Sequence, residues 1–428
     1  MTMMSNLPSD LVEEILSRLP MKYMRSVRFT CKNWNALSKG QTFTKTHIDK
    51  VAAPREEEFQ MIVMMDYNVY LMSIVVNGTG LDPCKELKGK LTCLDEQVKV
   101  SYFLHCEGVL LCILRDDSRL VVWNPYYGQR KWIGSKHTYG LGERYSYSYA
   151  LGYNKSCRSH KILRFREKFR ESKIPNYFSW YEIYDFDYEL WRSLDVTPNC
   201  LLMSAQHGVS LKGNTYWFAK ELHSHRFTNH VMCYIMCFDF TRERFGPLLH
   251  LPQTTSGLDI VNLSCVREEK LAALFQPKGS NKIEIWITTE IEAKKVSWSK
   301  FLTVDKGPVV GIQISFNVSF LIEEEKKTAV VFHKKDRVRI IGEAGYLREV
   351  NLGNQESCWP HACSYVPSSL QIKKPQDGRR KKQSSSKRRI KKQSGGEAKR
   401  RKRDLSICNE ESLSFSVLFL EQDLLRCW

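Results

Sequence analysis

The sequence lacks the features that would place a protein in or across a membrane. Its longest apolar stretch, residues 61–76, is interrupted by Asp66 and Asn68 and is too short to span a bilayer. Residues 1–6 hold no apolar signal region, and the 14 cysteines are scattered without paired spacing. We therefore expect a protein of the nucleus or cytoplasm, not secreted, with reduced cysteines and no membrane segment.

Motifs for catalysis are also missing. There is no glycine-rich phosphate loop, serine nucleophile elbow or His-Glu helical zinc motif in the sequence. Asp185, Asp187 and Asp239 fall at predicted hairpin turns, where aspartate commonly bonds its own backbone. Two groups of soft metal ligands, within residues 223–237 and 358–363, lack a second pair at zinc-site spacing. We predict no catalytic residue, metal or cofactor, and interpret Cys233 and Cys237 as core cysteines in a strand.

Positive charge is concentrated in one segment. Residues 373–403 hold 16 lysines and arginines against Asp377 and Glu397, a local charge of +14 out of +18 for the chain. This composition is typical of disorder. The segment has no aromatic residue for base stacking, so nucleic acid is expected to bind only nonspecifically, through phosphate charge.

The basic residues of this segment form clusters that suit the acidic grooves of a nuclear-import receptor. They are Arg379, Arg380, Lys381, Lys382, Lys387, Arg388, Arg389, Lys391, Lys392, Lys399, Arg400, Arg401, Lys402 and Arg403. A passive solvated tail is the alternative. Residues 404–428 form a further C-terminal tail, to which we assign no role.

Near the N-terminus, apolar residues recur at helical spacing. A first set indicates one amphipathic helix, which Asp10 and Glu13 would cap and Pro20 would end. A second set indicates one or two more short helices. The first set is Leu11, Ile15, Leu16 and Leu19, and the second is Met24, Val27, Cys31, Trp34 and Leu37. The pattern predicts three short helices within residues 1–46.

Such a unit buries too little surface to be stable alone, and its apolar stripes exceed what three short helices can cover. Another protein or the chain's own downstream domain could cover them, and the pattern leaves both open. Lys22, Arg25, Arg28 and Lys32 fringe the apolar set and would suit a negatively charged partner.

The order of these residues resembles the F-box family over residues 5–46. The matching elements are Leu-Pro at 7–8, Leu11, Glu-Ile-Leu at 14–16, Arg-Leu-Pro at 18–20 and Cys-Lys-x-Trp at 31–34. The resemblance implies binding to a Skp-type adaptor and, through it, to a cullin–RING ubiquitin ligase. Carried over, the adaptor face is Leu7, Pro8, Leu11, Ile15, Leu16, Leu19 and Pro20, with Met24, Val27, Cys31 and Trp34 behind it.

After a predicted linker at residues 47–58, residues 59–372 have the two-residue period of β-strands. Five strand–turn units are marked by Trp123, Tyr184, Phe238, Trp286 and Ile340, at steps of 61, 54, 48 and 54 residues. Repeats of about 50 residues with three or four strands are typical of propeller blades. We predict an all-β domain, a five- or six-bladed β-propeller closed by a strand within 357–372, with a β-sandwich as the alternative.

Residues 100–370 also resemble the plant F-box-associated domain, which is propeller-like. Trp-Asn-Pro at 123–125, Gly-Asn-Thr-Tyr-Trp at 213–217 and the hairpin at 238–245 stand in the family's order. The sequence departs at His160, where the family commonly has an aromatic residue, and in the charged insert at 164–173. The resemblance implies a non-catalytic substrate receptor of an SCF ubiquitin ligase, which binds an unknown target protein.

Loop aromatics are candidate target-binding residues, because tyrosine is a common interface anchor. The candidates are Tyr126, Tyr127, Tyr145, Tyr147 and His225. Two other classes of function stay open. A propeller enzyme would need a polar funnel with a perturbed acid–base pair, and a nuclear nucleic-acid-associated protein would act through the basic tail.

Overall fold

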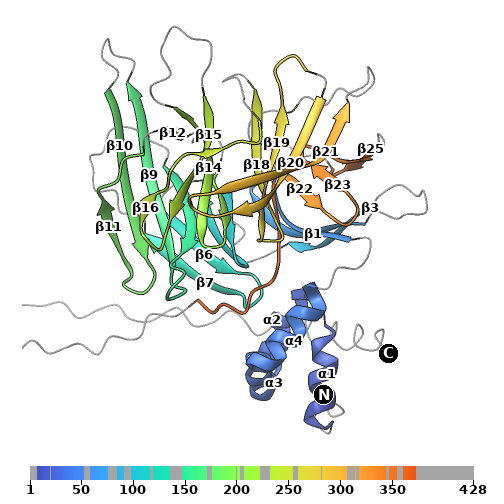
Figure 1. Cartoon of the computed structure of the whole chain (residues 1–428). Helices are drawn as coiled ribbons and strands as arrows, with labels where there is room; N and C mark the ends of the chain where they lie inside the picture. The colour runs from blue at the N-terminus through green and yellow to red at the C-terminus, as the bar shows by residue number, and fades with distance from the viewer. Residues whose placement is uncertain are drawn as a thin grey trace, which may run out of the picture.

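The computed structural model consists of a small helical unit beside a six-bladed β-propeller (Figure 1). It describes residues 7–19, 21–52, 58–75, 84–90, 98–115, 119–134, 147–170, 176–198, 200–202, 207–221, 232–253, 259–280, 282–305, 314, 318–343, 347–353 and 360–372. The expected basic segment 373–403, with its import residues, and the tail 404–428 lie outside this range. Within the described chain, none of the helices has the length and apolar character needed to cross a bilayer.

The helical unit, residues 7–52, contains four α-helices and one turn of 3-10 helix. They are α1 (Ser9–Ser17), η2 (Met21–Tyr23), α2 (Met24–Thr30), α3 (Lys32–Leu37) and α4 (Gln41–Ala52). The first three α-helices agree with the pattern in the sequence. The predicted capping box is wrong, because Pro8 is the N-cap of α1 and Asp10 lies inside its first turn. There the Asp10 carboxylate favours the helix by facing the positive end of the helix dipole.

Helix α4 was not predicted, and it occupies the first half of the expected linker. Its sequence is rich in threonine and has little amphipathic pattern, so it carries no clear helical signal. Packing accounts for it: Phe43 enters the core of the helical unit. That core is completed by Val12, Leu16, Leu19, Met24 and Val27, with Trp34 and Leu37 packed against it. The unit therefore covers most of its own apolar stripe.

The propeller has six antiparallel sheets arranged around an axis. Blade one is β26 (His361–Ser364), β1 (Glu58–Met65), β2 (Asn68–Val75) and β3 (Cys84–Lys90); blade two is β4 (Val100–Cys106), β5 (Val109–Leu114), β6 (Arg119–Asn124) and β7 (Gln129–Gly134); blade three is β8 (Ser148–Tyr153), β9 (His160–Arg170), β10 (Asn176–Asp185) and β11 (Leu190–Leu194). Blade four is β12 (Cys200–Leu202), β13 (Val209–Leu211), β14 (Asn214–Glu221), β15 (Cys233–Asp239), β16 (Arg244–Phe245) and β17 (Leu249–His250); blade five is β18 (Ile260–Val266), β19 (Lys270–Gln276), β20 (Lys282–Ile291) and β21 (Val296–Asp305); blade six is β22 (Phe320–Glu323), β23 (Thr328–Val331), β24 (Arg337–Gly342) and β25 (Leu347–Asn351).

The repeat predicted from the sequence is confirmed. All five marker residues lie on the third strand of a blade, in β6, β10, β15, β20 and β24. The predicted closing strand is also confirmed, because β26 pairs with β1 through partners such as Ile62 and Cys363. Blade one is thus built from both ends of the domain, and this pairing closes the ring.

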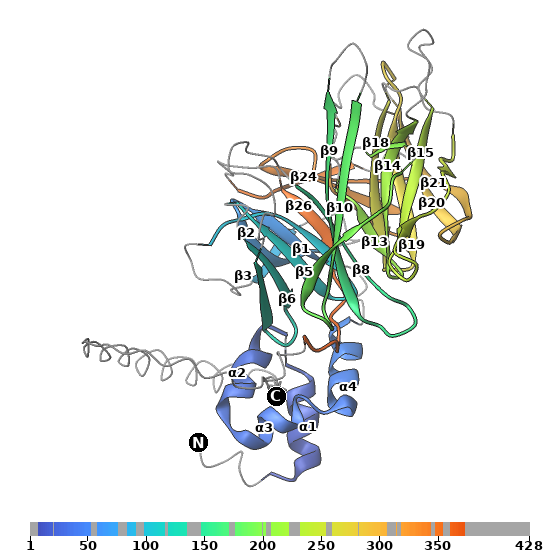
Figure 2. The same cartoon turned by 90° about the vertical axis from the view of Figure 1, so that its left-hand side faces the viewer.

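The two ends of the propeller differ in what they carry. The helical unit lies at the end where the β6–β7 turn is found, and the long β9–β10 hairpin points the other way (Figures 1 and 2). The charged insert predicted at 164–173 extends this hairpin, since β9 and β10 pair from Lys161↔Asp185 out to Arg170↔Asn176. A partner on the helices and a partner on the hairpin would therefore approach from opposite ends.

Candidate functional site

Large apolar side chains remain exposed on the helical unit. Leu7 is 36%, Leu11 is 52% and Phe29 is 71% exposed, and Pro8 beside them is also in solvent. Leu11 belongs to the first turns of α1, and Phe29 to the end of α2. Exposed apolar groups of this size commonly mark a protein interaction site. We call Leu7, Pro8, Leu11 and Phe29 the exposed apolar set.

Other residues expected on the adaptor face lie elsewhere. Leu16 and Leu19 are buried in the helical core, as are Met24 and Val27, so their side chains stabilise the unit itself. Ile15 is half-buried on the surface, and Pro20 lies outside the described residues. Sequence reasoning missed Phe29. The available signal was its position two residues after Val27, which turns it away from the buried stripe of the helix.

Cys31 and Trp34 have a structural role within the unit. The Cys31 Sγ accepts a hydrogen bond from the Trp34 backbone N–H at 3.4 Å, and Cys31 is the N-cap of α3. Trp34 is half-buried against the helical core. These two residues position α3, and Cys31 is also exposed.

Ionic contacts fasten α4 to α1. Lys50 Nζ donates to both carboxylate oxygens of Glu14 at 3.1 Å and to Ser17 Oγ at 2.8 Å. Arg18 Nε also donates to Glu14, at 3.0 Å. The hydrogen bonds from Lys50 and Arg18 lower the pKa of Glu14. Because these groups are largely solvated, they guide the packing of α4 more than they stabilise it.

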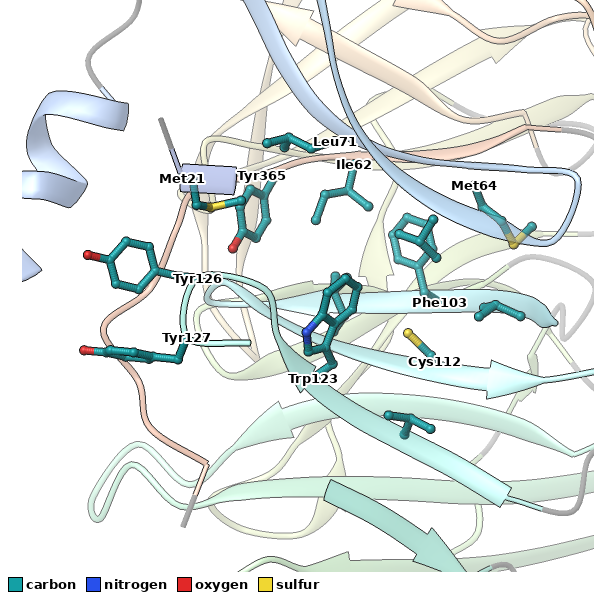
Figure 3. Close-up of a cluster of buried hydrophobic side chains, with 14 of the residues drawn as sticks. Met21, Ile62, Met64, Leu71, Phe103, Cys112, Trp123, Tyr126, Tyr127 and Tyr365 are labelled. Carbon is teal, nitrogen blue, oxygen red and sulfur yellow. The ribbon is translucent and has the colours of Figure 1, made fainter. Parts of the chain in front are cut away.

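Tyr126 and Tyr127, predicted as target-binding residues, lie in a different environment. Both are buried in the turn between β6 and β7, on the side of the propeller that faces the helical unit (Figure 3). The Tyr126 hydroxyl lies 3.0 Å from His47 Nδ1, and the Tyr127 hydroxyl lies 3.3 Å from Thr44 Oγ1. The prediction is wrong for these two residues, because their rings and hydroxyls are engaged by α2 and α4.

Arg28 lies against both of these tyrosines, whose rings pack edge to face with their centroids 5.0 Å apart. Its Nη1 donates to the Tyr126 carbonyl oxygen at 2.7 Å, and its guanidinium carbon lies 5.2 and 4.9 Å from the ring centroids of Tyr126 and Tyr127. Sequence reasoning placed Arg28 on the fringe facing a partner, but it is buried against the propeller. Arg28, Thr44, His47, Tyr126 and Tyr127 together form what we call the junction.

The protonation of His47 follows from its partners. Its Nε2 lies 2.7 Å from the Leu19 carbonyl oxygen, which can only accept, so Nε2 carries the proton. Nδ1 is then free to accept from the Tyr126 hydroxyl. Burial lowers the pKa of His47, which keeps the ring neutral. The end of α1, helix α4 and the propeller turn are thereby joined in one chain of hydrogen bonds.

A narrow cavity of about 100 Å³ follows the propeller axis. His207, His361 and Ser319 line it with other residues of the inner strands, and the His207 and His361 rings are 5.3 Å apart. Burial lowers the pKa of His207 to about 3 and of His361 to about 4, so both rings are neutral. His361 bonds the Phe103 carbonyl oxygen at 2.9 Å and contacts Ser319 at 3.3 Å. These bonds hold the inner strands together.

The aspartates expected at turns do bond their own backbone. Asp185 Oδ1 accepts from the Asp187 N–H at 2.9 Å, and Asp239 Oδ1 accepts from the Thr241 N–H at 2.9 Å. Cys233 and Cys237 are buried in β15, which confirms them as core cysteines. Within the described ranges, no three His, Cys, Asp or Glu side chains are placed to hold a metal ion.

The remaining target-binding candidates divide between described and undescribed parts of the chain. Tyr147 is half-buried, with its ring 5.3 Å from the Arg164 guanidinium carbon and 6.1 Å from the Trp180 ring. Tyr145, His225 and the histidines at 223 and 230 lie outside the described residues, as does Cys358.

Comparison with known proteins gives two family matches. Residues 4–46 match the F-box domain, and residues 60–372 match the F-box associated beta propeller domain. An Arabidopsis thaliana F-box/kelch-repeat protein is 49% identical over 403 residues, covering 88% of this chain and 92% of the relative. A putative F-box protein of the same plant is 48% identical over 404 residues, covering 89% and 90%. A protein named peroxiredoxin-2A, also from this plant, is 50% identical over 402 residues, covering 88% of this chain and 70% of the relative.

Proposed function

Since the chain belongs to the plant F-box proteins that carry an F-box-associated β-propeller, we propose that it is the substrate-recognition subunit of an SCF-type ubiquitin ligase. The helical unit binds a Skp-type adaptor, which connects it to a cullin–RING ligase. The propeller binds a target protein. Ubiquitin transfer is then accelerated because donor and target are held close together, and the receptor performs no chemical step itself.

The observation that carries this proposal is the exposed apolar set on a unit whose core is already filled. Val12, Leu16 and Phe43 are buried in that core, while Leu11 and Phe29 project into solvent. A helical unit that needed these side chains for its own stability would bury them. Their exposure supports a second molecule at this surface, with the aromatic side chain as an anchor and the leucine as apolar contact around it.

We assign target binding to the end of the propeller that lies away from the helices. The β9–β10 hairpin projects there (Figure 2). A target bound at that end would leave the exposed apolar set free for the adaptor. The arrangement supports simultaneous binding of both partners, which a bridging receptor requires.

A peroxidase function, suggested by the name of one relative, is less well supported. A peroxidatic cysteine needs a lowered pKa so that its thiolate can attack. Burial instead raises the pKa of Cys237 and of Cys265 to about 12, and it also raises the pKa of Cys106 and Cys363 well above the usual value of a thiol. These thiols are typical of core packing.

The adaptor surface is tested by two aspartate substitutions with matched controls. Leu11→Asp and Phe29→Asp should each lower the affinity for a purified plant Skp-type adaptor by at least tenfold, because each places a charge in a desolvated contact. The matched controls are Leu190→Asp and Tyr188→Asp on blade three, where the native side chains are 48% and 75% exposed. They should leave the affinity within twofold.

Isothermal titration of each full-length variant with the adaptor measures the effect. Retained affinity in both helical variants, or an equal loss in the blade-three controls, would refute the assignment. Circular dichroism of each variant checks that the helices remain folded.

A further inference from the structure

The junction is built around a buried cation that has no carboxylate partner among the described residues. Arg28 is only 9% exposed, and its single hydrogen bond in the described structure goes from Nη1 to the Tyr126 carbonyl oxygen. Its Nε and Nη2 are buried without a partner there. The charge is balanced mainly by the faces of Tyr126 and Tyr127. Burying a charge in this way is unfavourable unless the rings keep a defined position around it.

The junction differs in kind from the other contacts between the two parts. Met21 of η2 and Ile48 of α4 pack against the cluster that contains Ile62, Trp123 and Tyr365 (Figure 3). Such apolar contacts hold two bodies together but are not directional, so they tolerate sliding and rotation. The contact of the guanidinium with both rings requires a distance and an angle. Orientation therefore depends on Arg28 more than on the apolar contacts.

Both tyrosines also reach a second helix. Tyr126 bonds His47 and Tyr127 bonds Thr44, so α4 is tied to the turn that encloses the α2 arginine. His47 continues to the Leu19 carbonyl at the end of α1. Residues of α2, of α4 and of the segment that follows α1 are thus linked, directly or through His47, to one four-residue turn of blade two. A change at Arg28 would loosen that turn from α2 while leaving the helical core intact.

We propose that Arg28 is a positioning residue that fixes the angle between the helical unit and the propeller, and thereby determines which lysines, on the propeller itself or on a protein bound to it, the ligase can reach. The first half of this proposal concerns the chain alone. The second half rests on the proposed function.

The angle can be measured with two spin labels on the full-length chain. One label is attached to Cys157, an exposed native cysteine between β8 and β9. The other is attached to a cysteine introduced by Lys45→Cys at an exposed position of α4. Cys31, also exposed, is replaced by serine, which can still cap α3. The cysteines at 84, 93, 358, 408 and 427, whose side chains lie outside the described residues, are replaced by serine.

Double electron–electron resonance should give one narrow distance distribution in this parent chain. Arg28→Met, which keeps the apolar stem and removes the charge, should broaden the distribution at least twofold. The double variant Tyr126→Leu with Tyr127→Leu should do the same from the propeller side. The control Arg18→Met changes an exposed arginine of α1 and should leave the distribution unchanged. An unchanged distribution in both junction variants would overturn the proposal.

A second readout separates positioning from binding. In a reconstituted ligase with the adaptor and cullin–RING subunits, Arg28→Met should keep adaptor affinity within twofold but change which lysines of the receptor itself become ubiquitinated, as mapped by mass spectrometry. An identical modification pattern despite a broadened distance distribution would overturn the second half. If the adaptor fails to bind the parent chain, the proposed function fails while the distance result for Arg28 still stands.

Discussion

At the scale of single residues, a buried contact between Glu268 and His105 joins two blades. Glu268 Oε1 lies 3.1 Å from His105 Nε2. The Gly108 N–H lies 3.0 Å from that nitrogen and 3.4 Å from Glu268 Oε1, so both groups share this backbone donor. Burial, with the nearby Glu107 charge, raises the pKa of Glu268 to about 7, and burial lowers the pKa of His105 to about 4.

The raised pKa of Glu268 predicts that its contribution to stability is lost as pH rises through neutrality. A carboxyl group whose pKa is raised by folding stabilises the fold fully below its unfolded pKa of about 4.5, and this contribution disappears as pH rises through about 7. The contribution of Glu268 to the free energy of unfolding should therefore fall by about 0.8 kcal/mol between pH 6.5 and 8. Urea titrations of the parent and of Glu268→Gln at each pH should show the difference between their unfolding free energies changing by this amount. Parallel curves for parent and variant would contradict the raised pKa of Glu268.

The buried histidines act in the opposite direction and at lower pH. Burial lowers the pKa of His105, His160 and His361 to about 4, so each stabilises the fold above its unfolded pKa of 6.5 and loses this contribution as pH falls. The unfolded-state histidines are still half protonated at pH 6.5, so they go on adding stability up to about pH 8, equally in the parent and in Glu268→Gln. The difference between the two curves therefore isolates Glu268.

The roles of individual side chains were the hardest feature to predict from the sequence. His160 departs from the aromatic residue common in the family, yet its ring packs 5.5 Å from Tyr153 and 6.3 Å from Phe186, so it fills an aromatic position. Tyr126 and Tyr127 have the composition of interface anchors, but their interface is within the chain. The presence of a tyrosine predicts that its ring and hydroxyl will make contacts, but only the tertiary structure shows which residues they contact.

At the scale of elements, the chain after β26 forms a strap across the helix-side end of the propeller. Asn124 Nδ2 donates to the carbonyl oxygens of Ser368 and Leu370 at 3.1 and 2.6 Å, and the Ile372 N–H donates to Gln129 Oε1 at 2.8 Å. A Cβ on Gly108 would lie 2.3 Å from Ser368 Cβ. The strap therefore needs glycine at this turn, both for space and for its φ of +71°.

Two glycines with nearly equal φ angles allow the effect of space to be measured apart from the effect of φ. Gly279 has φ +73° and open space around its Cβ position. Gly279→Ala should cost about 1 kcal/mol of unfolding free energy from backbone strain alone. Gly108→Ala should cost about 1–3 kcal/mol more, because the strap must move. Urea unfolding followed by tryptophan fluorescence measures both, and equal losses would show that the strap contributes nothing at this point.

Elements with strong local patterns were predictable, and those formed by tertiary contact were not. The strand–turn units of blades two to six repeat within the sequence, so their spacing identified third strands correctly. Blade one has no contiguous repeat, because β26 comes from the far end of the domain. Helix α4 depends on two contacts with residues that are distant in the sequence. Phe43 packs in the core of the helical unit, and His47 bonds the Leu19 carbonyl. The linker prediction failed for that physical reason.

At the scale of the whole molecule, the proposed function divides the two binding surfaces between opposite ends. The exposed apolar set lies on the helices, and the β9–β10 hairpin projects from the other end of the propeller (Figure 1). The junction keeps these ends in a fixed relation. The sequence predicted both modules and their order. It could not predict the fixed relation, since that depends on pairs such as Arg28 and Tyr126, which are 98 residues apart.

Hydrogen–deuterium exchange of the full-length chain, with and without a saturating Skp-type adaptor, tests this division most directly. The account predicts that the adaptor slows exchange in residues 7–37, around Leu11 and Phe29, and leaves the β9–β10 hairpin unchanged. Protection of that hairpin, with residues 7–37 exchanging as in the free chain, would contradict it.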